Sequence, residues 1–86
     1  MWTEQGNQLV QIFEFEDFNS AFAFMSRVAL LADTMNHHPD WRNLYNKVEI
    51  RLSTHEAGNI ITDKDWELAR RIDKLMKIPI AQQFTL

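Results

Sequence analysis

The 86-residue chain contains no cysteine, which excludes disulfide bonds, thiol nucleophiles and thiolate-ligated metal sites. It has only two glycines and two prolines, so it offers little material for flexible linkers. No apolar run approaches the roughly 18 residues of a membrane-spanning helix, and the N-terminus carries no signal-peptide pattern. We therefore expect a soluble, cytoplasmic protein with no membrane partner.

Net charge and chain length indicate which partners and how many domains to expect. The chain has a formal net charge of −3, which argues against a nucleic-acid partner. A chain this short is expected to form one domain over residues 1–86, and such a domain buries only roughly 60–65% of its unfolded surface. Because 45% of the residues are hydrophobic, the sequence carries more apolar material than so small a core accommodates. We therefore expect an oligomer.

The strand signals come in two pairs. Residues 9–15 are β-prone and partly alternating, and we expect them to pair with a short strand near Trp2 across a turn at Gly6. Residues 47–53 alternate between apolar and polar side chains, which predicts a half-buried strand. A shorter strand over residues 41–45 is expected to precede it.

An amphipathic helix is expected between the two strand pairs. Asp17 is placed to cap it, and the apolar spacing predicts that it covers residues 18–35. The positions expected to face the sheet are 18, 21, 22, 25, 28, 29 and 32. A second apolar arc at Phe24, Leu30 and Leu31 predicts that the other side of the helix meets a partner.

A second helix is expected after the second strand pair. Thr62 is placed to cap it, with Asp65 three positions later in capping-box register. Its expected inward stripe consists of Leu68, Ala69, Ile72, Leu75 and Met76. Glu67 and Arg71 form an i,i+4 pair on its outer face. The order ββαββα predicts an α+β fold of two layers, a four-stranded antiparallel sheet with both helices on one face.

All three histidines fall in two short segments that flank one predicted strand. His37 and His38 precede Pro39, and His55 follows the strand over residues 47–53. Histidine is the only side chain whose unperturbed pKa, ~6.5, lets it exchange protons freely near neutral pH. Because only one strand and a turn separate the two segments, both can face a common cleft. This arrangement points to proton-transfer chemistry.

A metal site is the weaker interpretation of the same residues. His37 and His38 are adjacent, so their side chains diverge. His55 could supply a third nitrogen, but the spacing lacks the i,i+2 or i,i+4 pattern of zinc ligands. The plainest alternative is that these are solvated loop histidines and that Pro39 only ends the preceding helix. We predict neither a metal nor a cofactor.

Several segments together resemble a known family. They read Asn36-His37-His38-Pro39-Asp40-Trp41, then Val48-x-Ile50-x-Leu52-Ser53-Thr54-His55, and then Asp65-x-x-Leu68-Ala69. With the pattern of residues 13–29, which is similar to the family's second strand and first core helix, they resemble pterin-4a-carbinolamine dehydratase. The same family is known as the dimerisation cofactor of homeodomain transcription factors. The resemblance extends from Phe13 to about Ile72.

The resemblance implies an enzyme, a hydro-lyase that acts on 4a-hydroxytetrahydropterin as a 4a-hydroxytetrahydrobiopterin dehydratase. This carbinolamine is left when a pterin-dependent aromatic amino-acid hydroxylase turns over. Its products would be quinonoid dihydropterin and water, which places the reaction in tetrahydropterin recycling. Histidine general acid–base catalysis meets the chemical demand without a cofactor. The resemblance also implies a homotetramer built as a dimer of dimers, with a dimer as the fallback.

Carried over residue by residue, the resemblance makes His37 and His55 the acid/base pair and His38 a substrate-binding residue or second acid. The backbone from Thr54 to Ala57 would bind the amide edge of the pterin. The implied substrate-binding residues are Pro39, Thr54, Glu56, Ala57, Asp65 and Asp33. Which histidine is the acid, and which pterin side chain is used, stay open.

Asp65 has a second interpretation, because a carboxylate at the third position of a helix satisfies free backbone amides without any catalytic role. The chain also departs from the family pattern. Asp33 stands where the family usually has Glu, and the segment from His55 to Asp65 is one residue longer, so Asp63 could take the same role. The N-terminal helix of longer members has no counterpart. Trp41 and Tyr45 are expected to be core and cleft-wall aromatics.

A non-catalytic function is the alternative. Animal members of the family bind a homeodomain transcription factor through the first helix, and the outer apolar arc of this chain would suit such a partner. A pterin-binding module with a different substrate is a further alternative. The presence of all three histidines favours the enzyme.

Overall fold

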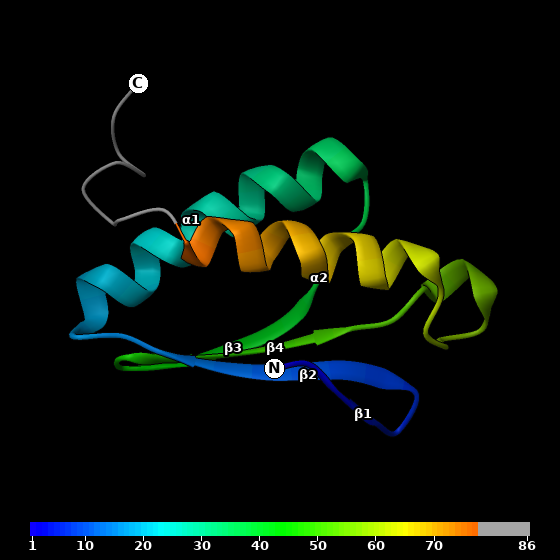
Figure 1. The fold of residues 1–86 in the computed structure, drawn as a ribbon, viewed down its shortest axis with the longest axis horizontal. Coiled ribbons are helices and arrows are strands. Elements are labelled where there is room, and N and C mark those ends of the chain that lie inside the picture. The colour runs from blue at the N-terminus through cyan, green and yellow to red at the C-terminus, as the bar shows by residue number, and fades with distance from the viewer. Residues whose placement is uncertain (78–86) are drawn as a thin grey trace.

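Two successive strand–strand–helix units build the chain (Figure 1). The structure is a computed structural model that describes residues 1–77. The elements are β1 (Thr3–Gln5), β2 (Gln8–Glu14), α1 (Phe18–Met35), β3 (Asp40–Leu44), β4 (Lys47–Leu52), the short 3₁₀ helix η1 (His55–Ala57) and α2 (Asp63–Met76). The predicted order ββαββα is confirmed. The predicted domain extends over residues 78–86, which lie outside the described residues.

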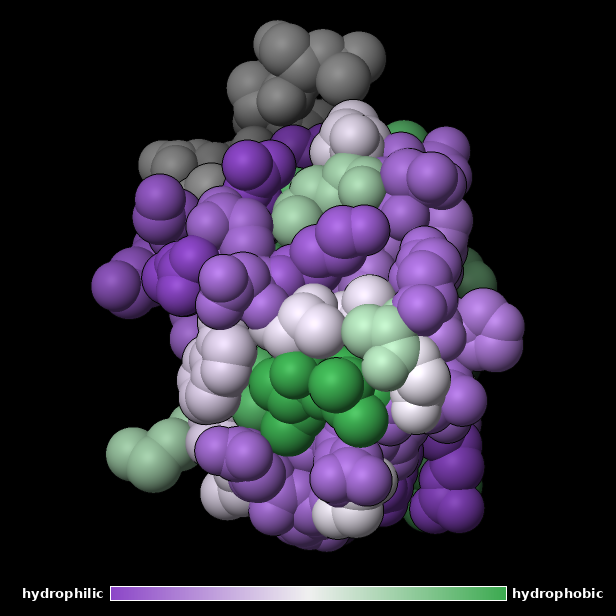
Figure 2. Space-filling model, turned by 90° about the vertical axis from the view of Figure 1, so that its right-hand side faces the viewer, coloured by the Kyte–Doolittle hydropathy of each residue, from purple (hydrophilic) through white to green (hydrophobic). Residues whose placement is uncertain are grey.

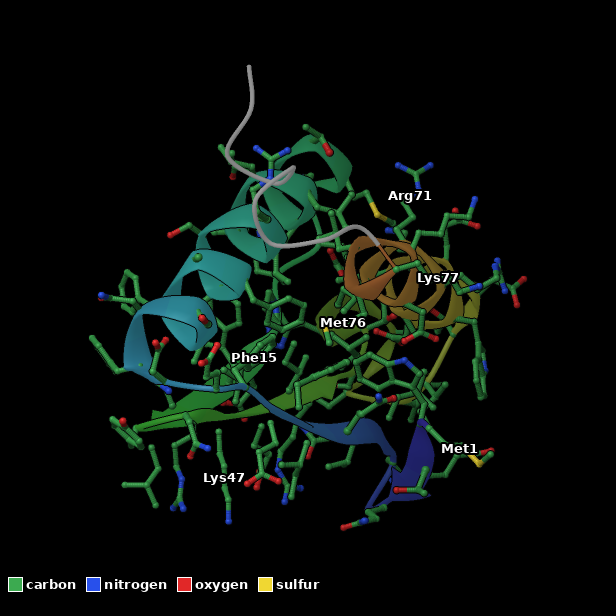
Figure 3. The ribbon with its side chains drawn as sticks, turned by 60° about the vertical axis from the view of Figure 1, so that its left-hand side comes forward. Met1, Phe15, Lys47, Arg71, Met76 and Lys77 are labelled. Carbon is green, nitrogen blue, oxygen red and sulfur yellow. The ribbon has the colours of Figure 1, made fainter. Side chains whose placement is uncertain are left out.

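The four strands form one antiparallel sheet in the order β1-β2-β4-β3. On its inner side, Phe13 of β2 pairs with Val48 of β4, and Trp41 of β3 pairs with Ile50. Both helices lie on this side of the sheet (Figure 1), whereas Lys47 points away from them (Figure 3). The predicted α+β fold of two layers is therefore confirmed.

The first helix has the predicted boundaries because both of its ends are satisfied locally. Asp17 Oδ1 accepts a hydrogen bond from the backbone N–H of Ser20 at 2.8 Å, and this bond holds the pKa of Asp17 below its ordinary value. At the other end Asn36 adopts a left-handed conformation with φ of 49°, and the N–H of His37 bonds to Ala32 O at 3.0 Å. This reversal fixes the position of His37 immediately after the helix.

The prediction of which side of α1 faces the sheet was partly wrong. Phe24, expected in the outer arc, is fully buried, with its ring centroid 4.9 Å from that of Phe13 and 5.0 Å from that of Phe15. Leu31, expected in the same arc, is partly buried against the core. The reason is that α1 is apolar on both sides, so periodicity alone does not select a face. The aromatic side chains of β2 and the segment after it decide the rotation of the helix.

The outward side of α1 is correspondingly different from the expected one. Phe18, Phe22 and Ala29 were expected to face the sheet, but all three are exposed. Leu30 is exposed as predicted, at 62%. We call the set Phe18, Phe22, Ala29 and Leu30 the outer α1 face. This face carries apolar side chains that the described part of the chain does not cover.

The second helix confirms its predicted cap and most of its stripe. Thr62 and Asp65 form the capping box, and Glu67 pairs with Arg71 at 2.9 Å. Leu68, Ala69 and Ile72 are buried, and Leu75 is partly buried against the core. Met76 was wrongly placed in this stripe, since it is exposed at the last position of the helix, where packing is weakest. Within residues 1–77, neither helix is long and apolar enough to cross a membrane.

The rotation of α1 can be tested with two matched phenylalanines. Phe24→Ala is expected to lower the free energy of unfolding by about 3–5 kcal/mol, because it opens a cavity among packed rings. Phe22→Ala, on the exposed side of the same helix, is expected to cost about 1 kcal/mol or less within a single chain, at a concentration low enough to keep the protein unassembled. Urea unfolding of both variants at equal concentration measures the difference. Equal losses would contradict this orientation of the helix.

Candidate active site

His37 is the buried member of the three histidines. Its side chain is 5% exposed, and Nε2 lies 2.6 Å from Asp65 Oδ1. The two residues are 28 positions apart in the chain, so this contact depends on the packing of α1 against α2. The left-handed turn at Asn36 directs His37 inward at the end of α1. A buried imidazole paired with a buried carboxylate is an arrangement typical of proton-transfer sites.

Asp65 itself is fully buried at the third position of α2. Its Oδ2 accepts hydrogen bonds from the Thr62 N–H and from the Thr54 hydroxyl, both at 2.8 Å. The two interpretations of Asp65 are therefore not alternatives in this structure. One oxygen caps the helix and the other binds His37. Asp63, considered for the same position, is exposed and is not part of this contact.

Each histidine has an oxygen next to one of its ring nitrogens. His38 Nε2 lies 3.2 Å from Asp33 Oδ1, and both side chains are exposed. His55 Nδ1 lies 3.1 Å from Asn59 Oδ1. Since a carboxylate or amide oxygen accepts, the ring nitrogen beside it donates, and the other nitrogen of a neutral ring carries the lone pair. The lone pair is thus assigned to Nδ1 of His37 and to Nε2 of His55.

Asn59 is a site residue that the sequence analysis missed. It lies four positions after His55, with a φ of 62°, just beyond η1. The signal was available, because Asn tolerates the left-handed conformation and an i,i+4 spacing across a tight turn brings two side chains together.

Glu56 is the exposed acidic residue of η1, next to His55 in the chain. The pKa of the Glu56 carboxyl is lowered, first by its own backbone N–H and then by the charge of Lys64, with smaller effects from the charges of His37 and His55. Both imidazoles therefore lie within electrostatic range of one exposed carboxylate. Glu56 is therefore ionised at neutral pH.

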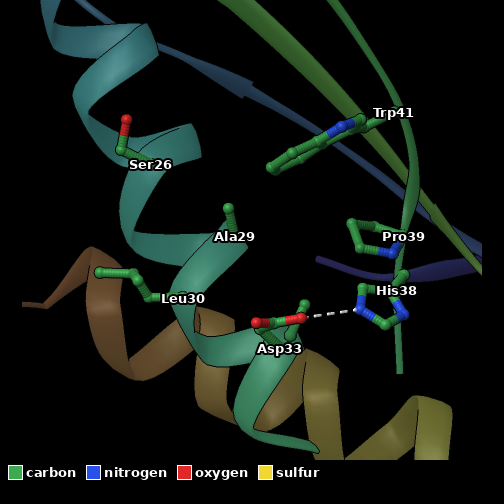
Figure 4. Close-up of a pocket in the computed structure, with 8 residues that line it drawn as sticks. Ser26, Ala29, Leu30, Asp33, His38, Pro39 and Trp41 are labelled. Carbon is green, nitrogen blue, oxygen red and sulfur yellow. Dashed lines mark hydrogen bonds and ion pairs between the residues drawn. The ribbon is translucent and has the colours of Figure 1, made fainter. Parts of the chain in front are cut away.

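Two hollows flank these residues. The first has a volume of about 630 Å³ and lies between α1 and the segment that leads into β3 (Figure 4). Asp33 of α1 faces His38 across it, and Pro39 and Trp41 lie on the same side as His38, opposite α1 (Figure 4). Trp41 is therefore the cleft-wall aromatic that was expected. Tyr45 is not part of the core, because it is 62% exposed in the β3–β4 turn.

The second hollow, of about 410 Å³, lies where β4, η1 and the start of α2 meet. Its lining residues are Thr54, Glu56, Ala57, Thr62, Asp63 and Lys64. This end of the molecule shows a hydrophobic patch among hydrophilic side chains (Figure 2), and Ile60 in the loop before α2 is 44% exposed. The hollow thus combines charged groups with an apolar neighbour.

The prediction that both histidine segments face one cleft was wrong, because they lie at two separate hollows that share no lining residue. His38, Asp33 and Pro39 line the first, and Thr54, Glu56 and Ala57 line the second. His37 lies between the two sets of lining residues: it is adjacent to His38 in the chain, and it contacts Asp65, which also accepts a hydrogen bond from Thr54. In residues 1–77 no three His, Asp or Glu side chains are grouped in a way that could hold a metal ion.

The backbone expected to bind a ligand is partly occupied within its own loop. The Thr54 N–H donates to Ile60 O at 2.8 Å. The Thr54 carbonyl accepts from Ala57 at 3.2 Å and from Asn59 at 3.0 Å. The His55 carbonyl is occupied as well, since it accepts from the Gly58 N–H at 3.0 Å. These bonds shape the loop around η1.

Comparisons with known proteins show which proteins the chain is similar to. The family model described as pterin 4 alpha carbinolamine dehydratase matches residues 1–75. A Synechococcus protein (strain WH7803) assigned as pterin-4-alpha-carbinolamine dehydratase is 51% identical, over 86% of this chain and 78% of its own length. A relative with the same assignment from Bradyrhizobium diazoefficiens is 49% identical, over 90% of this chain and 78% of its own.

Two solved structures are also similar. A transcriptional coactivator/pterin dehydratase from Brucella melitensis has a TM-score of 0.80 and 37% identity, covering 85% of this chain and 79% of its own. A pterin dehydratase-like protein identified as a RuBisCO assembly factor in the alpha-carboxysome has a TM-score of 0.72 and 27% identity, covering 86% of this chain and 87% of its own.

The hydrogen bonds around Asp65 predict a tautomer switch. In Asp65→Asn the two donors at Oδ2 would hold the amide oxygen on their side, so the new NH₂ group would face His37. His37 Nε2 would then have to accept, and its proton would move to Nδ1. Nitrogen-15 NMR of the ring nitrogens distinguishes the two tautomers. Retention of the Nε2–H form in the folded variant would contradict the assignment.

Proposed function

Because the chain belongs to the pterin 4 alpha carbinolamine dehydratase family, and its curated relatives bear the name of this hydro-lyase, we propose that it converts 4a-hydroxytetrahydropterin to quinonoid dihydropterin and water. We further propose that its histidines supply the acid and base, and that the reaction belongs to tetrahydropterin recycling. The observation that carries this proposal is the buried His37–Asp65 pair, which lies at 2.6 Å and leaves Nδ1 of the imidazole as a proton acceptor.

The reaction requires two proton transfers. One acid protonates the 4a oxygen, and the C4a–O bond breaks so that its electron pair leaves with water. The lone pair of the neighbouring ring nitrogen forms the new C=N bond, and that nitrogen then loses its proton to a base. General acid–base catalysis contributes about 10²–10⁴-fold for each positioned group. Two imidazoles meet the demand.

The oxygen partners of the histidines favour one division of roles. An imidazole that donates to a carboxylate is held in one orientation, and the carboxylate stabilises the imidazolium that forms when the ring takes up a proton. His37, which donates to Asp65, is therefore the proposed base. His55 donates to the neutral Asn59 amide, which stabilises an imidazolium less, so His55 is the proposed acid.

The second hollow is the proposed pterin site. Its volume of about 410 Å³ suits a fused two-ring ligand, since ligand pockets commonly measure roughly 300–1,000 Å³. The ionised Glu56 presents acceptors for the N–H groups of the pterin amide edge, beside the backbone of His55. His38, with Asp33 and Pro39, lines the first hollow, and we propose a substrate-binding role for these three residues there.

An oligomer is proposed from the outer α1 face. Phe22 is 51% exposed and Leu30 is 62% exposed on this face, and a core of this size has no further room for them. We propose that copies of the chain pack through this face into the homotetramer that the family resemblance implies, with a dimer as the fallback.

A non-catalytic role is the second candidate, and the same face supports it. Two structural neighbours are named for protein partners, one as a coactivator and one as an assembly factor. A purely interacting protein would not depend on His37 or Asp65. Dehydration of enzymatically generated 4a-carbinolamine, followed with and without this protein, distinguishes the candidates. No acceleration would reject the enzyme.

Loss of either proposed acid or base should slow the reaction. His37→Ala and His55→Ala are each expected to lower the rate of dehydration by at least about tenfold, or ~1.4 kcal/mol of transition-state stabilisation. Lys47→Ala, on the opposite side of the sheet (Figure 3), is the control and should keep the native rate. If both folded histidine variants kept the native rate, the assignment would be wrong.

Assembly should depend on Leu30. Leu30→Glu is expected to shift the protein to a smaller species, because it would place an unpaired charge in an apolar contact. Lys74→Glu, on the exposed side of α2, is the control. Light scattering at micromolar concentration measures the mass. A native monomer would reject the oligomer, and an unchanged Leu30→Glu assembly would place the interface elsewhere.

A further inference from the structure

The hydroxyl of Thr54 lies in a chain of hydrogen bonds whose directions are fixed. A carboxylate oxygen only accepts, so Thr54 donates its single proton to Asp65 Oδ2. Thr54 Oγ1 is also hydrogen-bonded to Thr62 Oγ1, and with its own proton used it can only accept there. Thr62 therefore donates to Thr54, while Thr62 Oγ1 accepts from the Lys64 N–H at 3.3 Å.

This chain fills the lone pairs of one oxygen of Asp65. Oδ2 receives the Thr54 hydroxyl and the Thr62 N–H, both at 2.8 Å, so it has no room for a proton of its own. The remaining hydrogen bond of Asp65 joins its Oδ1 to His37 Nε2. The orientation of the carboxylate and the direction of the His37 bond are thus set from the Thr54 side.

We propose that Thr54 is a positioning residue for the reaction, which acts on His37 through Asp65. The inference rests on the proposed function and adds a residue to it. Thr54 is 4% exposed, and its hydroxyl is committed to Asp65 and Thr62, so the side chain is not a substrate contact. Its role is to keep Asp65 unprotonated at Oδ2 and fixed in plane, so that His37 keeps one tautomer.

The charged groups around this chain come from three segments. His37 faces Asp65 directly from the end of α1. Lys64 belongs to the first turn of α2, and Glu56 of η1 lies within electrostatic range of both Lys64 and His37. None of these groups is altered by a change at Thr54. A substitution there therefore reports on the hydroxyl and not on a change in local charge.

Thr54→Val and Thr54→Ser form the test pair. Valine keeps the shape of threonine but removes the donor, so Oδ2 gains a free lone pair and can be protonated. The acid limb of the pH–rate profile of dehydration is expected to move up by about one pH unit. The value of kcat should fall about tenfold, while KM changes less than about twofold. Serine, which keeps the hydroxyl, should restore both to near native values.

A second measurement does not depend on activity. Carbon-13 NMR of the Asp65 carboxyl, without substrate, should show its titration midpoint about one pH unit higher in Thr54→Val than in the native chain and in Thr54→Ser. This reading tests the inference even if the native chain proves inactive, a result that would reject the proposed function alone. Should the valine variant not fold, Thr54→Ala replaces it.

The alternatives give different results, and each overturns the proposal. A packing role would lower stability in Thr54→Val and leave the Asp65 titration midpoint unchanged. A substrate contact would raise KM with kcat unchanged. If Thr54→Ser were as impaired as Thr54→Val, the methyl group and not the hydroxyl would be the important part of the side chain.

Discussion

The burial of one carboxylate determines the arrangement of the rest of the site. Asp65 is fully buried, and a buried carboxylate is strongly destabilising unless donors surround it. Its donors are His37 after α1, Thr54 after β4 and Thr62 at the start of α2. Thr62 is a local donor, three positions before Asp65, but Thr54 lies 11 positions and His37 28 positions away, so β4 and α1 must both be packed against α2 before the carboxylate is satisfied. The site therefore forms only together with the packed fold.

The sequence predicted those features that depend on neighbouring residues. Asp17 and the Thr62–Asp65 box set the starts of both helices through bonds spanning three positions, so α1 began at Phe18 as expected. The sequence did not predict which face of α1 packs against the sheet. Because the helix is apolar on both sides, its rotation depends on the contacts of Phe24 with the rings of Phe13 and Phe15, which no local pattern encodes.

The same distinction applies to the candidate site. The clustering of the three histidines and the resemblance to a family identified them as candidate site residues. The sequence did not predict which groups surround each of them. Adjacent in sequence, His37 and His38 have opposite environments, one buried against Asp65 and one exposed beside Asp33. Extended backbone before Pro39 sends neighbouring side chains to opposite sides, so adjacency predicts divergence without telling which histidine enters the interior. The packing of α2, which carries Asp65, determines that His37 is the buried one.

The two functions of Asp65 follow from the geometry of a helix start. The third residue of a helix directs its side chain back toward the cap, where free N–H groups need an acceptor. A carboxylate has a second oxygen that the cap does not use, and in this fold that oxygen meets His37. The group that fixes the beginning of α2 is thus the group that orients the imidazole. A change that loosens the first turn of α2 would therefore also release His37, which couples the stability of this helix to the proposed chemistry.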